Sequence, residues 1–200
     1  MPTITEVIDD IKMKIFELRR SSPLPFALDD DEIAALLAYS HDVHGVEQRG
    51  RLYFELNAML RRRDPSTRHL IASNWGVYMH YVMSAMQKLP DFAGTCWRGM
   101  QGRDQVLSEY VVGRPIQWGA FTSTTTNVVA AKNFASRNDG VLFKITVTSG
   151  KDINGFSFFP SEDEILLSPN HRFIVSSAPY DLDGYTVIDM VQSSGHTFVS

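Results

Sequence analysis

The sequence predicts an α+β protein, with helices in the first half of the chain and strands in most of the second. Up to about residue 88, apolar residues recur at spacings of three and four, which is typical of amphipathic helices. After residue 90 they alternate with polar residues or form short runs of strand length. At 200 residues the chain is long enough to bury a core. We therefore expect one domain over 1–200, with a helical part at 1–90 and a β-rich core at 91–200.

The helical part is expected to contain four helices. The first covers 3–20 and has one apolar stripe, which favours a helix docked on its own core over a dimer seam. The acidic run 29–32 caps the start of the second helix, since acids there meet free N–H groups and the positive end of the dipole. The third covers about 50–63, and the fourth covers 70–88 before Leu89-Pro90. The stripe of the first helix consists of Ile4, Ile8, Ile11, Ile15 and Leu18.

The second half is expected to contain strands and one internal helix. Arg98 stands in a short, mostly apolar strand at 95–99, where its charge needs a partner. A hydroxyl-rich strand covers 117–126, and a helix follows over 128–137 with Phe134 inward. Alternation then predicts a strand over 141–148. Two further β-rich segments, 172–176 and 186–191, flank an Asp183-Gly184 turn.

Three acidic residues precede the buried apolar run Ile165-Leu166-Leu167. On an extended backbone, Glu162 and Glu164 point the same way while Asp163 points away. Neighbouring carboxylates raise each other's pKa because like charges resist joint ionisation. Such a pair can divide the work, one group holding charge while the other moves a proton. The competing interpretation is a solvated loop tip.

Composition argues against several classes of function. The net charge of −4 disfavours a nucleic-acid partner, and no apolar window is long enough to span a membrane. The amino terminus does not resemble a secretory signal peptide. Cys96 is the only cysteine, which excludes an internal disulfide and fits a reducing compartment. His41 and His44 lack an evident third ligand, so no metal site is expected.

Three motifs, taken in order, resemble the R-S-E class of NAD-dependent mono-ADP-ribosyltransferases. They are Trp97-Arg98-Gly99, Phe121-Thr122-Ser123-Thr124-Thr125 and Glu162-Asp163-Glu164. Each motif alone is common, but the ordered set is specific. Stretches 53–61 and 156–160 are also similar to the arginine-specific animal ecto-enzymes, to which bacterial toxins are related. The resemblance implies the ADP-ribosyltransferase fold, with a helical N-terminal part packed on two short mixed β-sheets that form an NAD cleft.

The resemblance also implies which residues bind NAD. Arg98 anchors the phosphates and ribose, which suits a planar guanidinium, and the Gly99 backbone meets the nicotinamide carboxamide. Ser123 hydrogen-bonds the catalytic glutamate, and Thr124 and Thr125 continue its strand. For Arg98, a structural ion pair inside the sheet is the alternative.

Two residues near the internal helix complete the implied NAD site. Phe134 stacks on the nicotinamide and Arg137 approaches a phosphate. For Phe134, packing in the core is an equally good interpretation, because an aromatic ring on the inner face of a helix ordinarily lies there.

The two glutamates carry the implied chemistry. Glu164 matches the catalytic glutamate, whose carboxylate holds the ribose 2′-hydroxyl and stabilises the positive charge that develops when the nicotinamide–ribose bond breaks. Glu162 matches the residue that directs transfer to arginine. The expected function is mono-ADP-ribosylation of arginine on a protein substrate, with NAD as co-substrate, no metal, and self-modification left open.

Two alternatives share this site. One is an NAD glycohydrolase, in which water is the acceptor, and the other is an inactive NAD-binding or interaction module of the same fold. The chain lacks the signal and the disulfides of the animal ecto-enzymes, so it resembles an intracellular member or a toxin-like effector. We expect it in the cytoplasm, or secreted as an effector by a route that needs no signal peptide.

Overall fold

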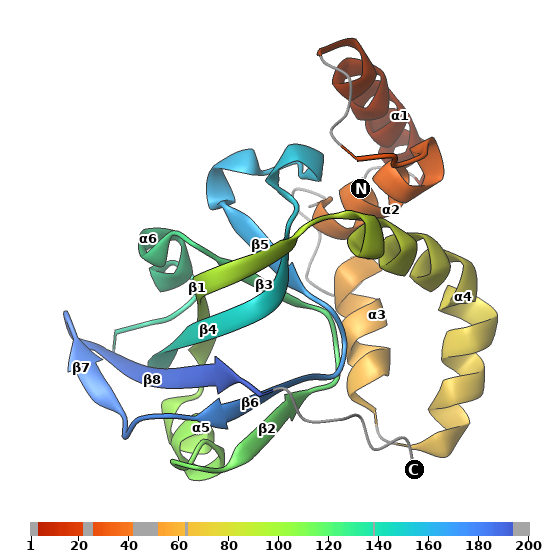
Figure 1. Cartoon of the computed structure of the whole chain (residues 1–200). Coiled ribbons are helices and arrows are strands. Elements are labelled where there is room, and N and C mark those ends of the chain that lie inside the picture. The colour runs from red at the N-terminus through yellow and green to blue at the C-terminus, as the bar shows by residue number, and fades with distance from the viewer. Residues whose placement is uncertain (1–3, 22–25, 42–51, 63, 138, 194–200) are drawn as a thin grey trace. The chain divides into compact units, whose positions relative to one another are not determined.

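The computed structural model describes residues 4–21, 26–41, 52–62, 64–137 and 139–193. Contacts divide the chain into two compact units, Met1–Pro90 with Ile153–Ser161, and Asp91–Asp152 with Glu162–Ser200. The first unit is helical and the second contains the strands (Figure 1). The expectation of one domain over 1–200 stays a prediction.

In its described residues, the helical unit contains four α-helices and a short 3-10 helix. They are α1 (Ile4–Ser21), α2 (Asp30–Ser40), α3 (Leu52–Arg61), α4 (Pro65–Lys88) and η1 (Asn154–Phe156). The fourth helix begins earlier than expected because Asp64 caps it, accepting a hydrogen bond from the Ser66 N–H at 3.1 Å. Residues 3, 50, 51 and 63 of the expected helices, and His44, lie outside the described residues.

The acidic run does cap α2, as expected. The Asp29 carboxylate accepts from the Glu32 N–H at 2.8 Å, and Glu32 accepts in return from the Asp29 N–H at 2.9 Å. Glu32 is only 2% exposed, and its charge is compensated by Lys88 of α4 at 2.6 Å. In α1 the apolar stripe is only partly inward, since Ile11 is buried but Ile8 is 44% exposed.

The second unit is built on one eight-stranded mixed sheet with the order β1-β3-β5-β4-β8-β6-β2, and β7 beside β8. Two short helices, α5 (Arg103–Glu109) and α6 (Val128–Lys132), connect its strands. The strands are β1 (Asp91–Gln101), β2 (Pro115–Trp118), β3 (Thr122–Thr125), β4 (Gly140–Asp152), β5 (Glu164–Leu167), β6 (His171–Val175), β7 (Tyr180–Leu182) and β8 (Tyr185–Gln192).

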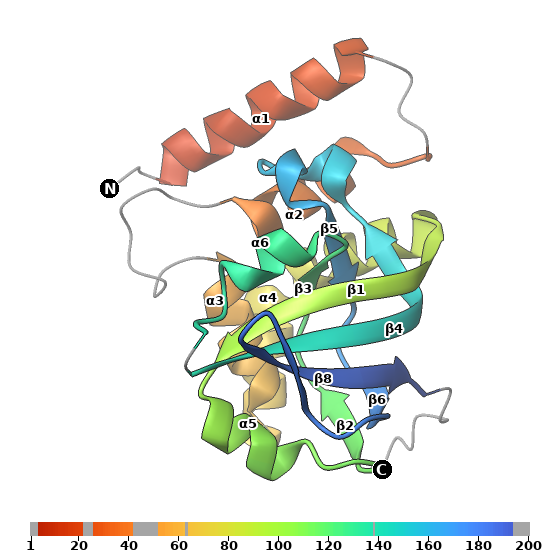
Figure 2. The ribbon, with the colours of Figure 1, turned by 90° about the vertical axis from the view of Figure 1, so that its left-hand side faces the viewer.

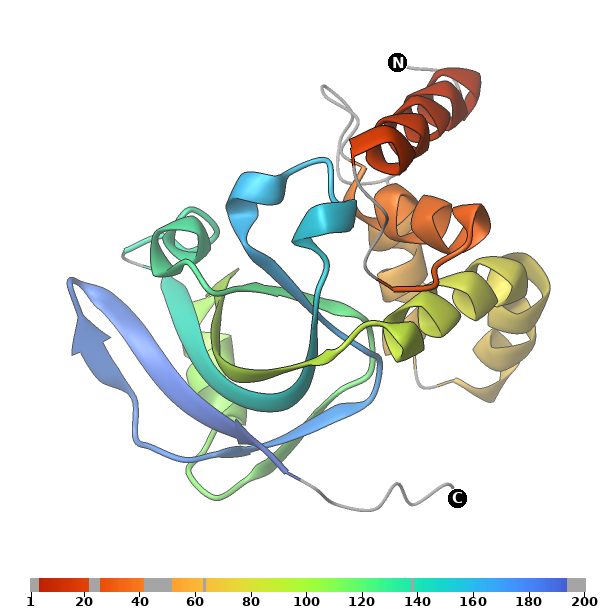
Figure 3. The ribbon, with the colours of Figure 1, turned by 45° about the horizontal axis from the view of Figure 1, so that its top comes forward.

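The expectation of two short sheets is wrong, because β4 is one long strand that joins both halves. Its residues 141–146 pair with β8 in parallel, and Lys151 and Asp152 pair with β5. Along most of its length β4 also pairs with β1, and the two strands curve together (Figure 3). Since β1 also pairs with β3 through Trp97 and Thr125, the strands β1, β3, β5 and β4 form a closed circuit.

Two other boundaries differ from expectation. The predicted strand at 117–126 is two strands, because β2 pairs with β6 whereas β3 pairs with β5. The predicted helix at 128–137 ends at Lys132, and helix α5 was not expected at all. Because α6 is so short, Phe134 lies beyond it and is 58% exposed, not inward.

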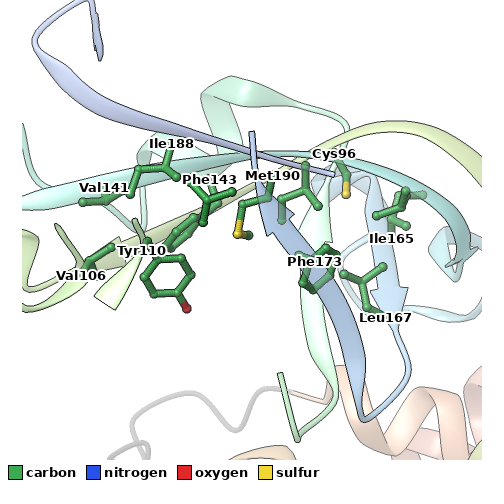
Figure 4. Packing of buried hydrophobic residues seen from close by; sticks show 13 residues of the cluster. Cys96, Val106, Tyr110, Val141, Phe143, Ile165, Leu167, Phe173, Ile188 and Met190 are labelled. Atoms are coloured by element: carbon green, nitrogen blue, oxygen red, sulfur yellow. The ribbon is translucent and has the colours of Figure 1, made fainter. Parts of the chain in front are cut away.

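Alternating side chains of the sheet enter two apolar clusters. The larger includes Phe143, Ile165 and Phe173 and is shown in Figure 4. The smaller consists of Ala131, Ala135, Leu142 and Val187, and joins α6 and the residues after it to the sheet. Leu142 and its neighbour Phe143 enter different clusters, as the alternation of a strand requires.

None of the helices in the described residues is both long and apolar enough to cross a membrane.

Candidate active site

The acidic stretch is not one extended strand. The 3-10 turn η2 (Pro160–Glu162) ends at Glu162, Asp163 has a left-handed φ of 48°, and β5 starts at Glu164. The expectation of a continuous extended backbone is therefore wrong. Aspartate is one of the few residues that tolerate this conformation. Two hydrogen bonds tie the bend to β3, from Thr125 Oγ1 to the Glu162 carbonyl at 2.6 Å and from the Thr126 N–H to the Asp163 carbonyl at 3.1 Å.

Glu164 begins β5 as a buried carboxyl group. Its side chain is 8% exposed and hydrogen-bonds to the Ser123 side chain on the neighbouring strand. Burial raises the pKa of Glu164 from 4.5 to about 7, although the Ser123 hydrogen bond and the Arg98 charge oppose this. The Glu162 charge raises the pKa of Glu164 further, but it is secondary to burial. Repulsion within the pair is thus real but is not the main cause that we expected.

Arg98 finds its partner on β3. Its Nη1 donates to the Ser123 carbonyl oxygen at 2.7 Å, and its charge lies close enough to lower the pKa of Glu164. The structure thus brings together Arg98, Ser123 and Glu164, which lie far apart in the sequence. A cation, a hydroxyl and a carboxyl whose pKa is near neutrality are groups suited to binding an anion and stabilising positive charge beside it.

The two threonines after Ser123 use their hydroxyls within the protein. Thr124 Oγ1 donates to the Ile165 carbonyl at 2.7 Å. Thr125 Oγ1, besides its bond to Glu162, accepts from the Asn127 N–H at 2.9 Å. Both side chains are buried, so they fix the strand and bend that hold the glutamates. Their contact with NAD stays a prediction.

Gly99 has a packing reason to be glycine. A Cβ atom there would collide with the Ala131 carbonyl oxygen, so β1 and α6 approach closely only without a side chain. Two residues further along β1, Gln101 holds the segment after α6, since it donates to the Phe134 carbonyl at 3.3 Å and accepts from the Ser136 N–H at 3.4 Å.

Phe134 and Arg137 lie on this segment, at the surface. The Phe134 ring does not pack in the core, so that alternative is wrong, and the exposed ring is available to a flat ligand. Arg137 is exposed, with its guanidinium carbon 5.8 Å from the centre of the Tyr185 ring. Sequence reasoning missed Tyr185, because only the pairing of β8 brings it beside this segment.

Within the part of the chain that the structure describes, no three His, Cys, Asp or Glu side chains lie together so that they could hold a metal ion. That the chemistry needs no metal stays a prediction.

Comparison with known proteins gives a consistent result. A family model described as NAD:arginine ADP-ribosyltransferase matches residues 3–196. The Mav protein of Mycobacterium avium (strain 104) is 33% identical over 170 residues, which are 82% of this chain and 18% of Mav. The human GPI-linked NAD(P)(+)--arginine ADP-ribosyltransferase 1 is 30% identical over 167 residues, 80% of this chain and 47% of that protein. The chain thus spans less than two thirds of these curated relatives.

Solved structures show the same fold. The ADP-ribosyltransferase Vis of Vibrio splendidus, solved with the M6 inhibitor, superposes with a TM-score of 0.67 at 26% identity, covering 96% of this chain and 86% of Vis. The eukaryotic mono-ADP-ribosyltransferase ART2.2 gives a TM-score of 0.70 at 20% identity, covering 98% of this chain and 82% of that one. The expected α+β fold is confirmed by this likeness.

Proposed function

The chain belongs to the NAD:arginine ADP-ribosyltransferase family, and from this premise we propose that it moves ADP-ribose from NAD to arginine side chains of target proteins and releases nicotinamide. The observation that carries the proposal is the meeting of Arg98, Ser123 and Glu164 across β1, β3 and β5. These three residues are the ordered set by which the sequence resembles the family. NAD is the co-substrate that the family implies.

We propose that NAD binds along these strands and the segment after α6. The Arg98 guanidinium takes the pyrophosphate oxygens, because its planar fork of donors matches paired phosphate oxygens. The exposed Phe134 ring stacks on the nicotinamide, and Arg137 approaches a phosphate. The Gly99 backbone meets the carboxamide.

In the proposed reaction, the bond between ribose C1′ and the nicotinamide nitrogen breaks, and its electron pair leaves with neutral nicotinamide. Positive charge develops on the ribose, where the Glu164 carboxylate stabilises it through the 2′-hydroxyl. A guanidine nitrogen of the acceptor then forms a bond to C1′, and Glu162 takes the proton that this nitrogen loses. The Ser123 hydrogen bond fixes the direction of the Glu164 carboxyl throughout.

The first test measures nicotinamide release from NAD by the purified protein, with and without agmatine as a small guanidine acceptor. We expect release to depend on agmatine, with formation of ADP-ribosyl-agmatine. Nicotinamide release that is the same with and without agmatine would favour the glycohydrolase. NAD binding without nicotinamide release would favour the inactive module. Labelled ADP-ribose found on the chain itself would establish self-modification.

The roles of the two glutamates are tested by three matched variants. Glu164→Gln should abolish both transfer and NAD hydrolysis, because the charge on the ribose loses its partner. Glu162→Gln should abolish transfer to agmatine and leave some hydrolysis. Asp163→Asn removes the charge between them but keeps a side chain that tolerates a left-handed φ, so it should retain transfer. Transfer that survives in Glu162→Gln would show that the assigned roles are wrong.

We further propose that the target is a protein that presents an arginine and that no nucleic acid takes part. The compartment is likewise a proposal: the cytoplasm, or export by a route that needs no signal peptide. Fractionation of the producing cells and their medium, with detection of the chain by antibody, tests it. Chain detected in neither fraction but in the membrane pellet would contradict both options.

A further inference from the structure

The hairpin of β7 and β8 lies against the segment that carries Phe134 and Arg137. Its turn is Asp183-Gly184, and both residues have positive φ, at 55° and 81°. Leu182 and Tyr185, on either side of the turn, pack against the cluster that contains Ala131 and Ala135. Figures 1 and 2 show the hairpin and α6 at the same end of the sheet.

Two cations, Lys132 at the end of α6 and Arg137 on the segment after it, share the Tyr185 ring. Lys132 Nζ lies 5.2 Å from the ring centre, and the Arg137 guanidinium carbon lies 5.8 Å from it. An aromatic face attracts a cation but does not consume its N–H donors. The ring therefore restrains the position of each cation while leaving hydrogen bonds to an anion available.

The hairpin supplies a carboxylate partner to Lys132 but not to Arg137 in the contacts described. Asp183 pairs with Lys132 at 3.0 Å from Oδ2 to Nζ, which satisfies this charge. For Arg137, the ion pairs between described residues include no carboxylate partner. One cation is thus neutralised by the turn of the hairpin, and the other contacts the ring and has no carboxylate partner among the described residues.

The segment is held from both sides. Gln101 of β1 fixes its backbone at Phe134 and Ser136 on the side of the sheet. Tyr185 restrains Arg137 on the side of the hairpin. A guanidinium that is already restrained loses less conformational freedom when it meets an anion, so its contribution to binding is larger.

We infer that the β7–β8 hairpin contributes to NAD binding. Tyr185 positions Arg137 for the pyrophosphate, and the ion pair with Asp183 keeps Lys132 from binding the pyrophosphate. This inference rests on the proposed function, in which Arg137 approaches a phosphate. It makes Tyr185 and Asp183 positioning residues whose removal changes NAD affinity in opposite directions.

The test is calorimetric titration of NAD into variants of the full chain, all carrying Glu164→Gln so that NAD is not cleaved. Tyr185→Leu keeps an apolar side chain against the cluster but removes the aromatic face. We expect its Kd for NAD to rise about two- to fivefold, the range for an exposed cation–π contact. Tyr185→Phe should restore the original Kd, because it keeps the ring.

Asp183→Asn should act the other way. It keeps a residue that tolerates the positive φ of the turn but frees the Lys132 charge, so the Kd for NAD should fall about two- to fivefold at low ionic strength. The gain should shrink at high salt, because freed surface charges are screened. The control is Asp181→Asn in the same hairpin, whose carboxylate accepts from the Gly184 N–H and pairs with no cation in the contacts described.

A hairpin that is merely structural would give weaker binding in both Tyr185→Leu and Asp183→Asn, and that result overturns the inference. Unchanged binding in both variants overturns it as well. The proposed function is judged separately, by nicotinamide release from the chain with Glu164 intact. Release there, together with unchanged affinity in the hairpin variants, would refute the inference and leave the proposed function standing.

Discussion

Replacing Glu164 by glutamine should make the protein more stable at neutral and alkaline pH, although it abolishes activity. The Glu164 side chain is 8% exposed, and burial raises its pKa from 4.5 to about 7. Below pH 4.5 the carboxyl group is neutral in both the folded and unfolded states, so its burial does not lower the free energy of unfolding through ionisation. As the pH rises from 4.5 to about 7, the unfolded chain loses this proton first, and the folded state becomes progressively less stable.

The size of this effect follows from the pKa. Raising a pKa from 4.5 to about 7 corresponds to roughly 3 kcal/mol, at about 1.4 kcal/mol for each pKa unit. Glu164→Gln should therefore raise the free energy of unfolding by up to about 3 kcal/mol above pH 7. In a chain of this length, that is an increase of about 6–12 °C in Tm.

The assay is denaturant unfolding of the original chain and Glu164→Gln at a series of pH values from 4.5 to 8.5. The difference between them isolates Glu164, because all other titrating groups are shared. It should be near zero at the acidic end and reach its plateau above pH 7. In parallel, nicotinamide release by the original chain should rise with pH through about 7, as the carboxylate forms. A difference that does not grow with pH, or a variant no more stable at pH 8, would refute the reasoning.

Three further substitutions, two of them with a matched control, distinguish residues that stabilise the fold from a residue proposed only to contact NAD. Thr125→Val removes a buried hydroxyl that bridges two backbone groups, so it should lower the free energy of unfolding by about 1–3 kcal/mol. Its control is Thr126→Val at the next residue, which is exposed, and this variant should change the free energy of unfolding little. Phe134→Ala should raise the KM for NAD and leave the Tm unchanged, because the ring is 58% exposed; a lowered Tm would contradict this. Gly99→Ala should lower the free energy of unfolding by about 1–3 kcal/mol, because its Cβ collides with the α6 backbone. Its control is Gly76→Ala, whose added Cβ meets nothing within 4 Å, and this variant should be neutral or slightly stabilising in thermal melts.

The candidate site residues could be named from the sequence because each lies in a short local motif, and the structure brings Arg98, Ser123 and Glu164 together. The acid before an apolar run, the arginine in a strand and the hydroxyl-rich strand are each visible in the sequence. The capping box of α2 was also predictable, since its partners are three residues apart. Local signals of this kind need no knowledge of which strands pair.

What sequence reasoning missed depends on contacts between distant residues. The structure has one sheet where we predicted two, because β4 continues through Gly150. The missing side chain of Gly150 lets Ile165 of β5 approach. The bend at Asp163 is held by hydrogen bonds from β3, which no local pattern reveals. The position of Tyr185 depends likewise on the pairing of β7 with β8. The dominance of burial over repulsion in the pKa of Glu164 is also a tertiary effect.

The closed circuit of β1, β3, β5 and β4 has a consequence for self-association. Strand β5 has paired neighbours on both sides, so its backbone is not open to a strand from another molecule. Strands β2 and β7 are four and three residues long, each has one paired neighbour, and β2 starts with Pro115, which has no N–H to donate. Edge-to-edge pairing through β2 or β7 could therefore form only a few main-chain hydrogen bonds. These two strands therefore offer little main-chain pairing to a strand of a second molecule.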